Sequence, residues 1–162
     1  MNTNVLLSID AATIYKTFKS TATTADKPQP VGAAHVSVMT SDGNTSTQNV
    51  TDVAVEEGDD LRWWVQSTGL YTCVIYNFID AKTGQTISSD IISPPALKTM
   101  GGQLLVDGSD PNNPKFQPTQ LHCWGADAQN TGTLSYGIQF SIYDHNGKAL
   151  GFYQFVGAAS AT

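Results

Sequence analysis

Residues 133–155 of the chain read TLSYGIQFSIYDHNGKALGFYQF, and this stretch decides the fold class. Large apolar side chains occupy every second position of its first half: Leu134, Tyr136, Ile138, Phe140 and Ile142. Small or polar residues fill the positions between them. Because successive side chains of a strand point to opposite faces of a sheet, the alternation predicts a strand with one buried face and one wetter face.

A turn signal follows this strand. The sequence Asp144-His145-Asn146-Gly147 contains an Asn-Gly pair, which supplies the two positive-φ positions that a tight hairpin turn needs. Apolar side chains then resume at Leu150, Phe152, Tyr153 and Phe155. We therefore predict a β-hairpin, which places the chain among the antiparallel β folds.

Shorter strand patterns, each bounded by turn residues, precede the hairpin. They lie at residues 4–9, 36–39, 50–55, 61–65, 73–79, 104–106 and 121–124. One short helix is expected after Asp10, a plausible N-cap, because Ala11, Ile14, Tyr15 and Phe18 have helical spacing. The total of eight or nine strands predicts an antiparallel two-sheet sandwich that forms a single domain over residues 1–162.

Three segments lead to more specific expectations. Residues 73–79 are apolar on both faces, which is typical of a covered strand in the middle of a sheet. Residues 94–118 hold five of the seven prolines, so we expect a long loop that contains only the short strand at 104–106. The acidic run at 56–60 is interpreted as a solvated turn whose charges protect a sheet edge from pairing.

Composition argues against several classes of partner. Charged residues make up 14% of the chain, and its formal net charge is −6. Nucleic acids and anionic membrane surfaces select basic stripes or runs of Lys and Arg, which this sequence lacks, so neither partner is expected. The first residues lack the basic start and long apolar region of a secretory signal, and no segment resembles a membrane span. We therefore expect a cytoplasmic protein.

The sequence offers little support for catalysis or for a metal centre. There is no Gly-x-Ser-x-Gly elbow, so we expect no catalytic residues, no enzyme and no cofactor. Cys73 and Cys123 are expected to be buried thiols, with a disulfide as the alternative. A zinc site from Cys73, His122 and Cys123 is disfavoured because adjacent strand residues point to opposite faces.

A binding site is the remaining possibility that the residues raise. Trp64 should face solvent, because Trp63 shares the face of the apolar residues beside it, and Trp124 lies near a polar segment. That segment carries Asp107, Asp110 and Asn112, whose side-chain oxygens suit sugar hydroxyls or calcium. The alternative function is therefore a carbohydrate-binding, lectin-like module or a calcium-dependent one. The competing interpretation is that the tryptophans anchor the core and that the polar segment forms ordinary turns.

Several segments, taken in order along the chain, resemble the AidA/PixA family of bacterial inclusion body proteins. They are the opening run at residues 5–10 with the helix after it, residues 30–39, residues 58–63 and residues 150–153. The resemblance implies a jelly-roll-like sandwich, cytoplasmic inclusions, and expression under population-density or stationary-phase control. It also implies a role in host interaction or virulence, and it supplies no catalytic residues.

Two features depart from that family. The chain has only three methionines, which does not fit the methionine-rich storage role attached to some relatives. Residues 154–157 replace the family's aromatic-Asp-Pro ending. Weak surface charge and many aromatic residues favour association between copies, so we expect self-assembly as a homodimer or a larger form.

Overall fold

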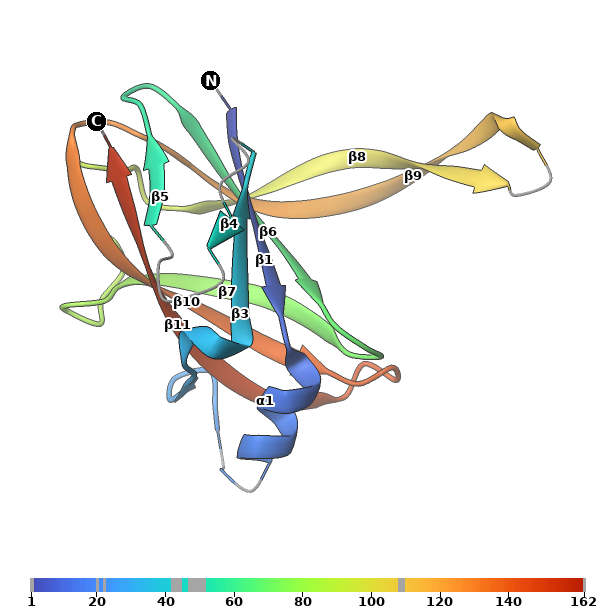
Figure 1. The fold of residues 1–162 in the computed structure, drawn as a ribbon, viewed down its shortest axis with the longest axis horizontal. Helices are drawn as coiled ribbons and strands as arrows, with labels where there is room; N and C mark the ends of the chain where they lie inside the picture. Colours follow the sequence, from blue (N-terminus) through green and yellow to red (C-terminus); the bar gives the residue numbers. More distant parts are fainter. Residues whose placement is uncertain are drawn as a thin grey trace.

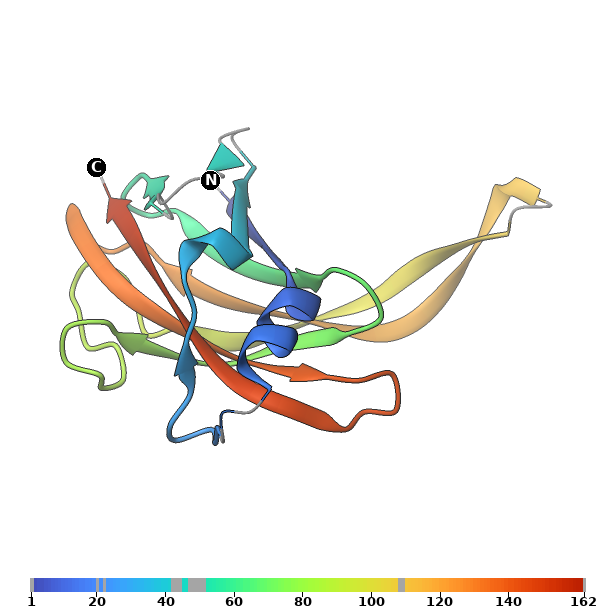
Figure 2. The ribbon, with the colours of Figure 1, turned by 60° about the horizontal axis from the view of Figure 1, so that its bottom comes forward.

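The structure is a computed structural model that describes residues 2–19, 21, 23–41, 45–46, 52–107 and 110–161. Two sheets pack face to face, and one short helix lies at an end of the pair (Figure 1, Figure 2). In chain order the elements are β1 (Asn2–Ile9), α1 (Ala11–Phe18), β2 (Gln29–Pro30), the 3-10 helix η1 (Ala33–His35), β3 (Val36–Thr40), β4 (Thr45–Ser46), β5 (Asp52–Val55), β6 (Asp60–Ser67), β7 (Thr72–Asp80), β8 (Ala96–Asp107), β9 (Asp110–Asp127), β10 (Gly132–Tyr143) and β11 (Ala149–Ala161). The prediction of an all-β fold with one short helix is confirmed, although the described residues form more strands than the eight or nine expected.

The two sheets are mixed, which corrects the expectation of an antiparallel sandwich. The first sheet has the order β4-β3-β1-β6-β9-β8, and the second has the order β2-β11-β10-β7 with β5 also paired to β11. The pairs β1·β6, β11·β2 and β11·β5 are parallel. Long connections allow this, because the chain between β1 and β6 is long enough to return to the starting end of the sheet. A jelly-roll connectivity stays a prediction.

The hairpin of β10 and β11 forms as predicted and supplies much of the core. All five alternating apolar side chains of β10 are buried: Leu134, Tyr136, Ile138, Phe140 and Ile142. The opposite face of β10 is less exposed to solvent than expected, since Gln139 and Ser141 are also buried. Gln139 lies between two other amides there, accepting a hydrogen bond from Asn77 at 2.9 Å and donating one to Gln154 at 3.2 Å.

The turn of this hairpin is longer than the sequence suggested. The Gly147 N–H donates to the Asp144 carbonyl, and the Asp144 N–H donates to the Lys148 carbonyl. His145 and Asn146 are therefore the central residues, and Gly147, with φ of 77°, follows them in the left-handed region. This is the arrangement of a turn followed by a bulge, in which the glycine occupies the position after the turn.

The short helix begins where the sequence placed it. The Asp10 carboxylate accepts a hydrogen bond from the Thr13 backbone N–H at 3.1 Å, which is the N-cap interaction. Ala11 and Ile14 are buried, and the ring of Phe18 lies 6.4 Å from that of Tyr153 in β11. The helix is thus anchored on the core by one apolar face.

Strand β7 lies at the edge of its sheet, so the prediction that it is central was wrong. Its pairing with β10 passes from Ile75–Phe140 to Asn77–Gln139, which makes Tyr76 an extra, bulged residue. The bulge changes which face each later residue occupies. The strand therefore looks apolar on both faces in sequence, although one side of it is open and Val74 is 43% exposed.

The proline-rich segment forms a long two-stranded ribbon, which corrects the prediction of a loop. β8 and β9 pair from Ala96–Gly125 out to Asp107–Asp110, with register shifts along the way. Pro111, Pro114 and Pro118 fall within those shifts. Proline is tolerated at bulges and open edges because it has no N–H to contribute to a ladder, so the composition resembles a loop although the backbone is paired.

The acidic turn between β5 and β6 is only partly solvated, because two of its carboxylates are engaged within the fold, and its role in protecting a sheet edge stays a prediction. Asp59 is buried, and its carboxylate accepts from the Glu56 N–H at 3.1 Å. Asp60 forms ion pairs with Arg62 at 2.7 Å and with Lys98 at 2.9 Å. β6 lies between β1 and β9, so this turn leads into the interior of the first sheet.

Candidate functional site

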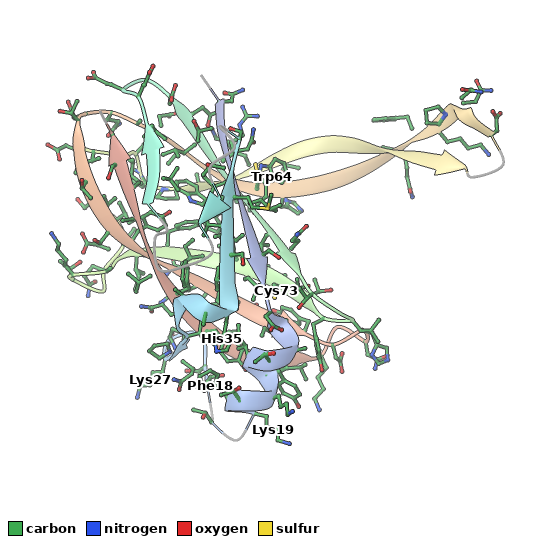
Figure 3. All side chains as sticks on the ribbon, in the orientation of Figure 1. Phe18, Lys19, Lys27, His35, Trp64 and Cys73 are labelled. Carbon is green, nitrogen blue, oxygen red and sulfur yellow. The ribbon has the colours of Figure 1, made fainter. Side chains whose placement is uncertain are left out.

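The two tryptophans singled out from sequence lie on opposite faces of the first sheet. Trp64 is half-buried on the outer face, where its indole N–H donates to the Asn4 side-chain oxygen at 3.0 Å (Figure 3). Trp124 is the cross-strand partner of Trp63, so it faces the interior. Its indole N–H donates to the Ile75 carbonyl at 3.1 Å. These positions do not combine into one aromatic platform.

The predicted polar ligands lie at the far end of the ribbon. Asp107 and Asp110 are paired across the ribbon, and residues 108–109 lie outside the described residues. The Asp110 carboxylate accepts from the Asn113 amide at 2.9 Å, and Asn112 is exposed. Along β8, ten strand positions separate the partner of Trp124 (Leu97) from the partner of Asp110 (Asp107), which corresponds to roughly 33 Å of extended chain. The structure therefore does not bring the polar segment and the tryptophans together.

The three histidines lie apart from one another, and one of them shares a cleft with a thiol. Cys73 and Cys123 are both free and buried, and burial raises the pKa of the Cys73 thiol to about 12. His35 ends the 3-10 helix and His145 lies in the β10–β11 turn, whereas His122 lines a cleft with Cys73. Among the described residues, no three His, Cys, Asp or Glu side chains are grouped in a way that could hold a metal ion.

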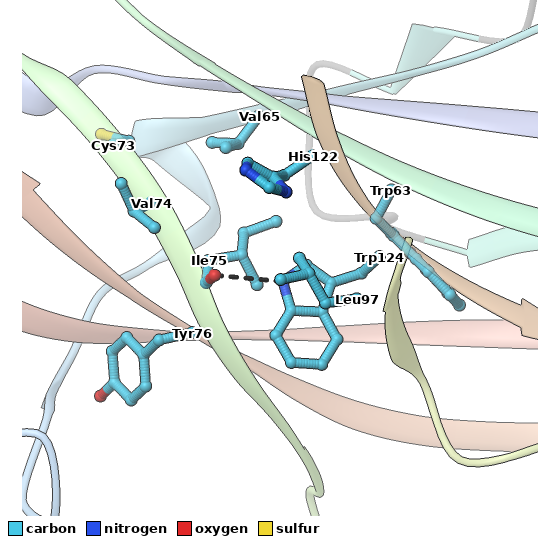
Figure 4. Close-up of a pocket in the computed structure, with 9 residues that line it drawn as sticks. All are labelled: Trp63, Val65, Cys73, Val74, Ile75, Tyr76, Leu97, His122 and Trp124. Atoms are coloured by element: carbon cyan, nitrogen blue, oxygen red, sulfur yellow. Dashed lines mark hydrogen bonds between the residues drawn. The ribbon is translucent and has the colours of Figure 1, made fainter. Parts of the chain in front are cut away.

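The cleft beside His122 is a concave surface that sequence reasoning did not find, and we call it the β7–β9 cleft. It opens between the two sheets, with a volume of about 620 Å³. Its lining comes from Trp63 and Val65 in β6, residues 73–76 in β7, Leu97 in β8, and His122 and Trp124 in β9 (Figure 4). The volume falls within the range of ligand pockets and binding clefts.

The cleft exists because β7 is an edge strand and because the ribbon leaves the body beside it. Leu97 and Val74 at this opening are 55% and 43% exposed. Sequence reasoning missed both, since Val74 was assigned to a covered strand and Leu97 to a loop. The signal that was available is the apolar Leu97, two positions after the Pro94-Pro95 pair, where a loop residue would have no core to contact.

The chemistry of the β7–β9 cleft is that of an apolar binding surface. Trp124 uses its N–H on the Ile75 carbonyl, and the high pKa of Cys73 keeps that thiol protonated at neutral pH. The described lining includes His122 but no carboxylate to pair with it.

A second, polar hollow lies on the outer face of the second sheet. It has a volume of about 410 Å³ and is lined in part by Asp26, Tyr76, Asn77 and Gln139. The Tyr76 hydroxyl donates to the Ala25 carbonyl at 3.1 Å. Burial, with a further contribution from the Asp26 charge, raises the pKa of Tyr76. The hollow thus combines an aromatic ring, two amides and a carboxylate.

Comparison with solved structures identifies chains of similar fold. The chain is similar to the crystal structure of an inclusion body protein (PixA) from Burkholderia cenocepacia J2315, with a TM-score of 0.77 and 15% sequence identity. The match covers 100% of this chain and 96% of that one. At this identity the likeness shows the fold alone.

Within the described residues, none of the helices has the length and apolar character needed to cross a membrane.

The comparison with protein families identifies the chain, whereas no curated protein matches it. The family model for PixA, described as inclusion body protein, matches residues 1–157. The chain therefore belongs to the PixA family of inclusion body proteins.

Proposed function

We propose that the protein is non-enzymatic and self-associating, and that it accumulates in inclusions through contacts between copies. The observation that carries this proposal is the open β7–β9 cleft, where Leu97 and Val74 present apolar surface to solvent. Contiguous exposed apolar surface on a protein marks an interaction site or an aggregation risk. A protein that assembles into dense inclusions uses such surface for its own packing.

The weak charge of the chain supports the same proposal. Only 14% of residues are charged, so electrostatic repulsion between copies is small in relation to the apolar area available. Obligate interfaces are typically more apolar than the rest of a protein surface and poor in charged residues at their centre. The cleft lining, with two tryptophans and no described carboxylate, matches that composition.

Sedimentation tests the proposal directly. Association makes the apparent mass depend on protein concentration, so sedimentation velocity over roughly a hundredfold concentration range should show dimers or larger species that increase with concentration. A strict monomer at every concentration would contradict the proposal. A homodimer is the smallest assembly that we expect.

The biological setting that we propose follows from the family resemblance. The protein would accumulate in the cytoplasm of a bacterium at high population density or in stationary phase and would act in host interaction or virulence. A fluorescent fusion followed through growth in the source bacterium, together with a deletion strain scored for host colonisation, tests both parts. Diffuse fluorescence at all growth stages and unchanged colonisation would contradict them.

The polar hollow favours a second candidate function, carbohydrate binding. Tyr76 contributes an aromatic ring to the hollow, while Asp26, Asn77 and Gln139 contribute the carboxylate and amide groups that recognise sugar hydroxyls. A glycan array tests this candidate, with the Asp26→Ala variant as its matched control. Repeating the array and a thermal melt with calcium tests the exposed Asp110 and Asn112 at the ribbon end. Absence of bound glycan would remove this candidate.

A further inference from the structure

The β8–β9 ribbon extends away from the two sheets, and no other strand of the described residues pairs with its outer part (Figure 1, Figure 2). β9 pairs with β6 only from Trp124 to Asp127, whereas its pairing with β8 continues to Asp107–Asp110. The two-stranded part beyond His122 spans roughly 25 Å at the rise of an extended strand. Every described side chain from Asn112 to Pro118 is exposed.

Such a ribbon lacks the packing that normally stabilises strands. A two-stranded antiparallel pair is marginally stable in water unless a third strand or another apolar surface covers it. Phe116 is 64% exposed and pairs directly with Leu104 across the ribbon. A large aromatic side chain is therefore presented in the middle of the element that most needs additional packing.

One edge of the ribbon does not favour growth of the sheet by strand addition. Pro111, Pro114 and Pro118 lie on the part of β9 whose second edge pairs with no strand of the described fold. Proline cannot donate a ladder hydrogen bond, and edge prolines oppose strand-to-strand pairing between molecules. The β9 side of the ribbon is therefore suited to contact through side chains.

The β7–β9 cleft begins at the base of the same ribbon. Leu97 and Trp124 line the cleft and belong to β8 and β9, so cleft and ribbon form one continuous surface. The ladder is regular from Ala96–Gly125 to Gly101–Gln120, and the ribbon then extends away from the body of the two sheets (Figure 2). In a two-fold dimer this contact would be made twice, each ribbon meeting the cleft of the other copy.

We infer that the ribbon of one copy docks in the β7–β9 cleft of a second copy, with Phe116 as its anchor and Leu97 and Val74 as the receiving rim. This inference rests on the proposed self-association and names its surface. The described part of this contact comprises the exposed residues 112–118 of the ribbon and the nine lining residues of the cleft on each copy, which approaches the roughly 20–30 residues a side of a stable specific interface.

Two charge substitutions test the two halves of this contact. Phe116→Asp damages the ribbon and Leu97→Asp damages the cleft, and both residues are exposed, so the fold should be retained. Buried aromatic anchors dominate interface energies, so each variant should weaken association by roughly tenfold or more in sedimentation equilibrium. Met39→Asp is the matched control, because Met39 is 46% exposed on β3, at the other side of the first sheet. It should change association by no more than about twofold.

Mixing the two damaged chains distinguishes a ribbon in a cleft from any other pairing. A third variant, Phe116→Lys, retains an intact cleft, and the Leu97→Asp chain retains an intact ribbon. In their mixture one contact keeps both native residues and the other pairs the introduced lysine with the introduced aspartate, so the mixture should associate more tightly than either variant alone. A mixture that associates no better than its components would overturn the inference, as would wild-type association by Phe116→Asp.

The two proposals fail in different ways. A wild-type protein that stays monomeric at all concentrations removes both of them. A wild-type protein that associates, while Phe116→Asp and Leu97→Asp associate equally well, removes only the ribbon-in-cleft contact. Circular dichroism and thermal melting of each variant establish that the fold is retained before association is compared.

Discussion

Trp63 and Trp124 are direct partners across β6 and β9, and both indoles contact the same ring, Phe78 of the opposite sheet. The ring-centroid distances from Phe78 are 5.0 Å to Trp63 and 5.3 Å to Trp124. Trp63 is buried and Trp124 is half-buried, and both line the β7–β9 cleft. Phe78 therefore joins the interior of the sandwich to the wall of its open side.

The first prediction concerns this aromatic contact. Phe78→Ala should lower the free energy of unfolding by about 3–5 kcal/mol, because it removes a buried ring and leaves a cavity between two tryptophans. Urea unfolding followed by tryptophan fluorescence measures the change. Phe116→Ala is the matched control, since Phe116 is exposed on the ribbon and should have little effect on a monomeric sample. Equal losses for the two variants would contradict the proposed core.

A second prediction concerns the start of the helix. Asp10→Ala should destabilise the protein by about 1 kcal/mol, because the Thr13 N–H loses its N-cap acceptor. Asp10→Asn keeps an acceptor oxygen at the same place and should restore most of the loss. Thermal unfolding of the three proteins measures the ranking. An Asn variant as unstable as the Ala variant would show that the cap bond contributes nothing.

The third prediction is a pH dependence at Asp60. Desolvation raises the pKa of this carboxyl group, but the opposing effects of Arg62 and Lys98 are together larger and leave the pKa below its ordinary value. Because the folded-state pKa is the lower one, the stabilisation is fully present above the unfolded-state pKa near ~4 and is lost as pH falls through the folded-state pKa. Unfolding free energies should therefore decline below about pH 4.

The Asp60→Asn variant isolates that contribution. At neutral pH it should lose about 1 kcal/mol, the scale of a partly exposed ion-pair network. In acid its stability should fall less steeply than that of the wild type, since the titrating carboxyl is gone. Urea titrations at several pH values measure both slopes, and parallel curves for the two proteins would refute the assignment.

The fourth prediction concerns the two thiols. Burial raises the pKa of Cys73 to about 12, so its reactive thiolate is scarce at neutral pH. Burial also raises the pKa of Cys123, although nearby Arg62 and Lys98 oppose the increase. Native protein should therefore react slowly with a disulfide reagent at pH 8, at a rate that follows unfolding. Rapid labelling of the native Cys123→Ser variant, which retains only Cys73, would contradict this burial.

The elements that the sequence predicted well are those in which local pattern and tertiary environment agree. The β10 alternation and the Asp10-capped helix each carry a complete local signal, one of period two and one of period 3.6 with a cap. Trp63 was correctly placed in the core because its strand neighbours share its face. No distant contact was needed for any of these inferences.

The elements that were predicted wrongly depend on contacts between distant segments. The bulge at Tyr76 changes the facing of β7, and only the pairing with β10 reveals it. The ribbon is paired through an irregular ladder whose prolines imitate a loop. The candidate site follows from both, because an edge strand and a departing ribbon together create the β7–β9 cleft. A single sequence contains no direct record of which strand is last in a sheet.

The position of β11 also has a consequence for biosynthesis. This strand is translated after all the other strands described, yet it pairs with β10, β2 and β5 in the finished sheet. The early strands β2 and β5 must therefore wait for a partner translated about a hundred residues after them, and such distant pairings form slowly. A nascent chain would expose unpaired apolar strands until β11 emerges from the ribosome, so the second sheet can close only after that point.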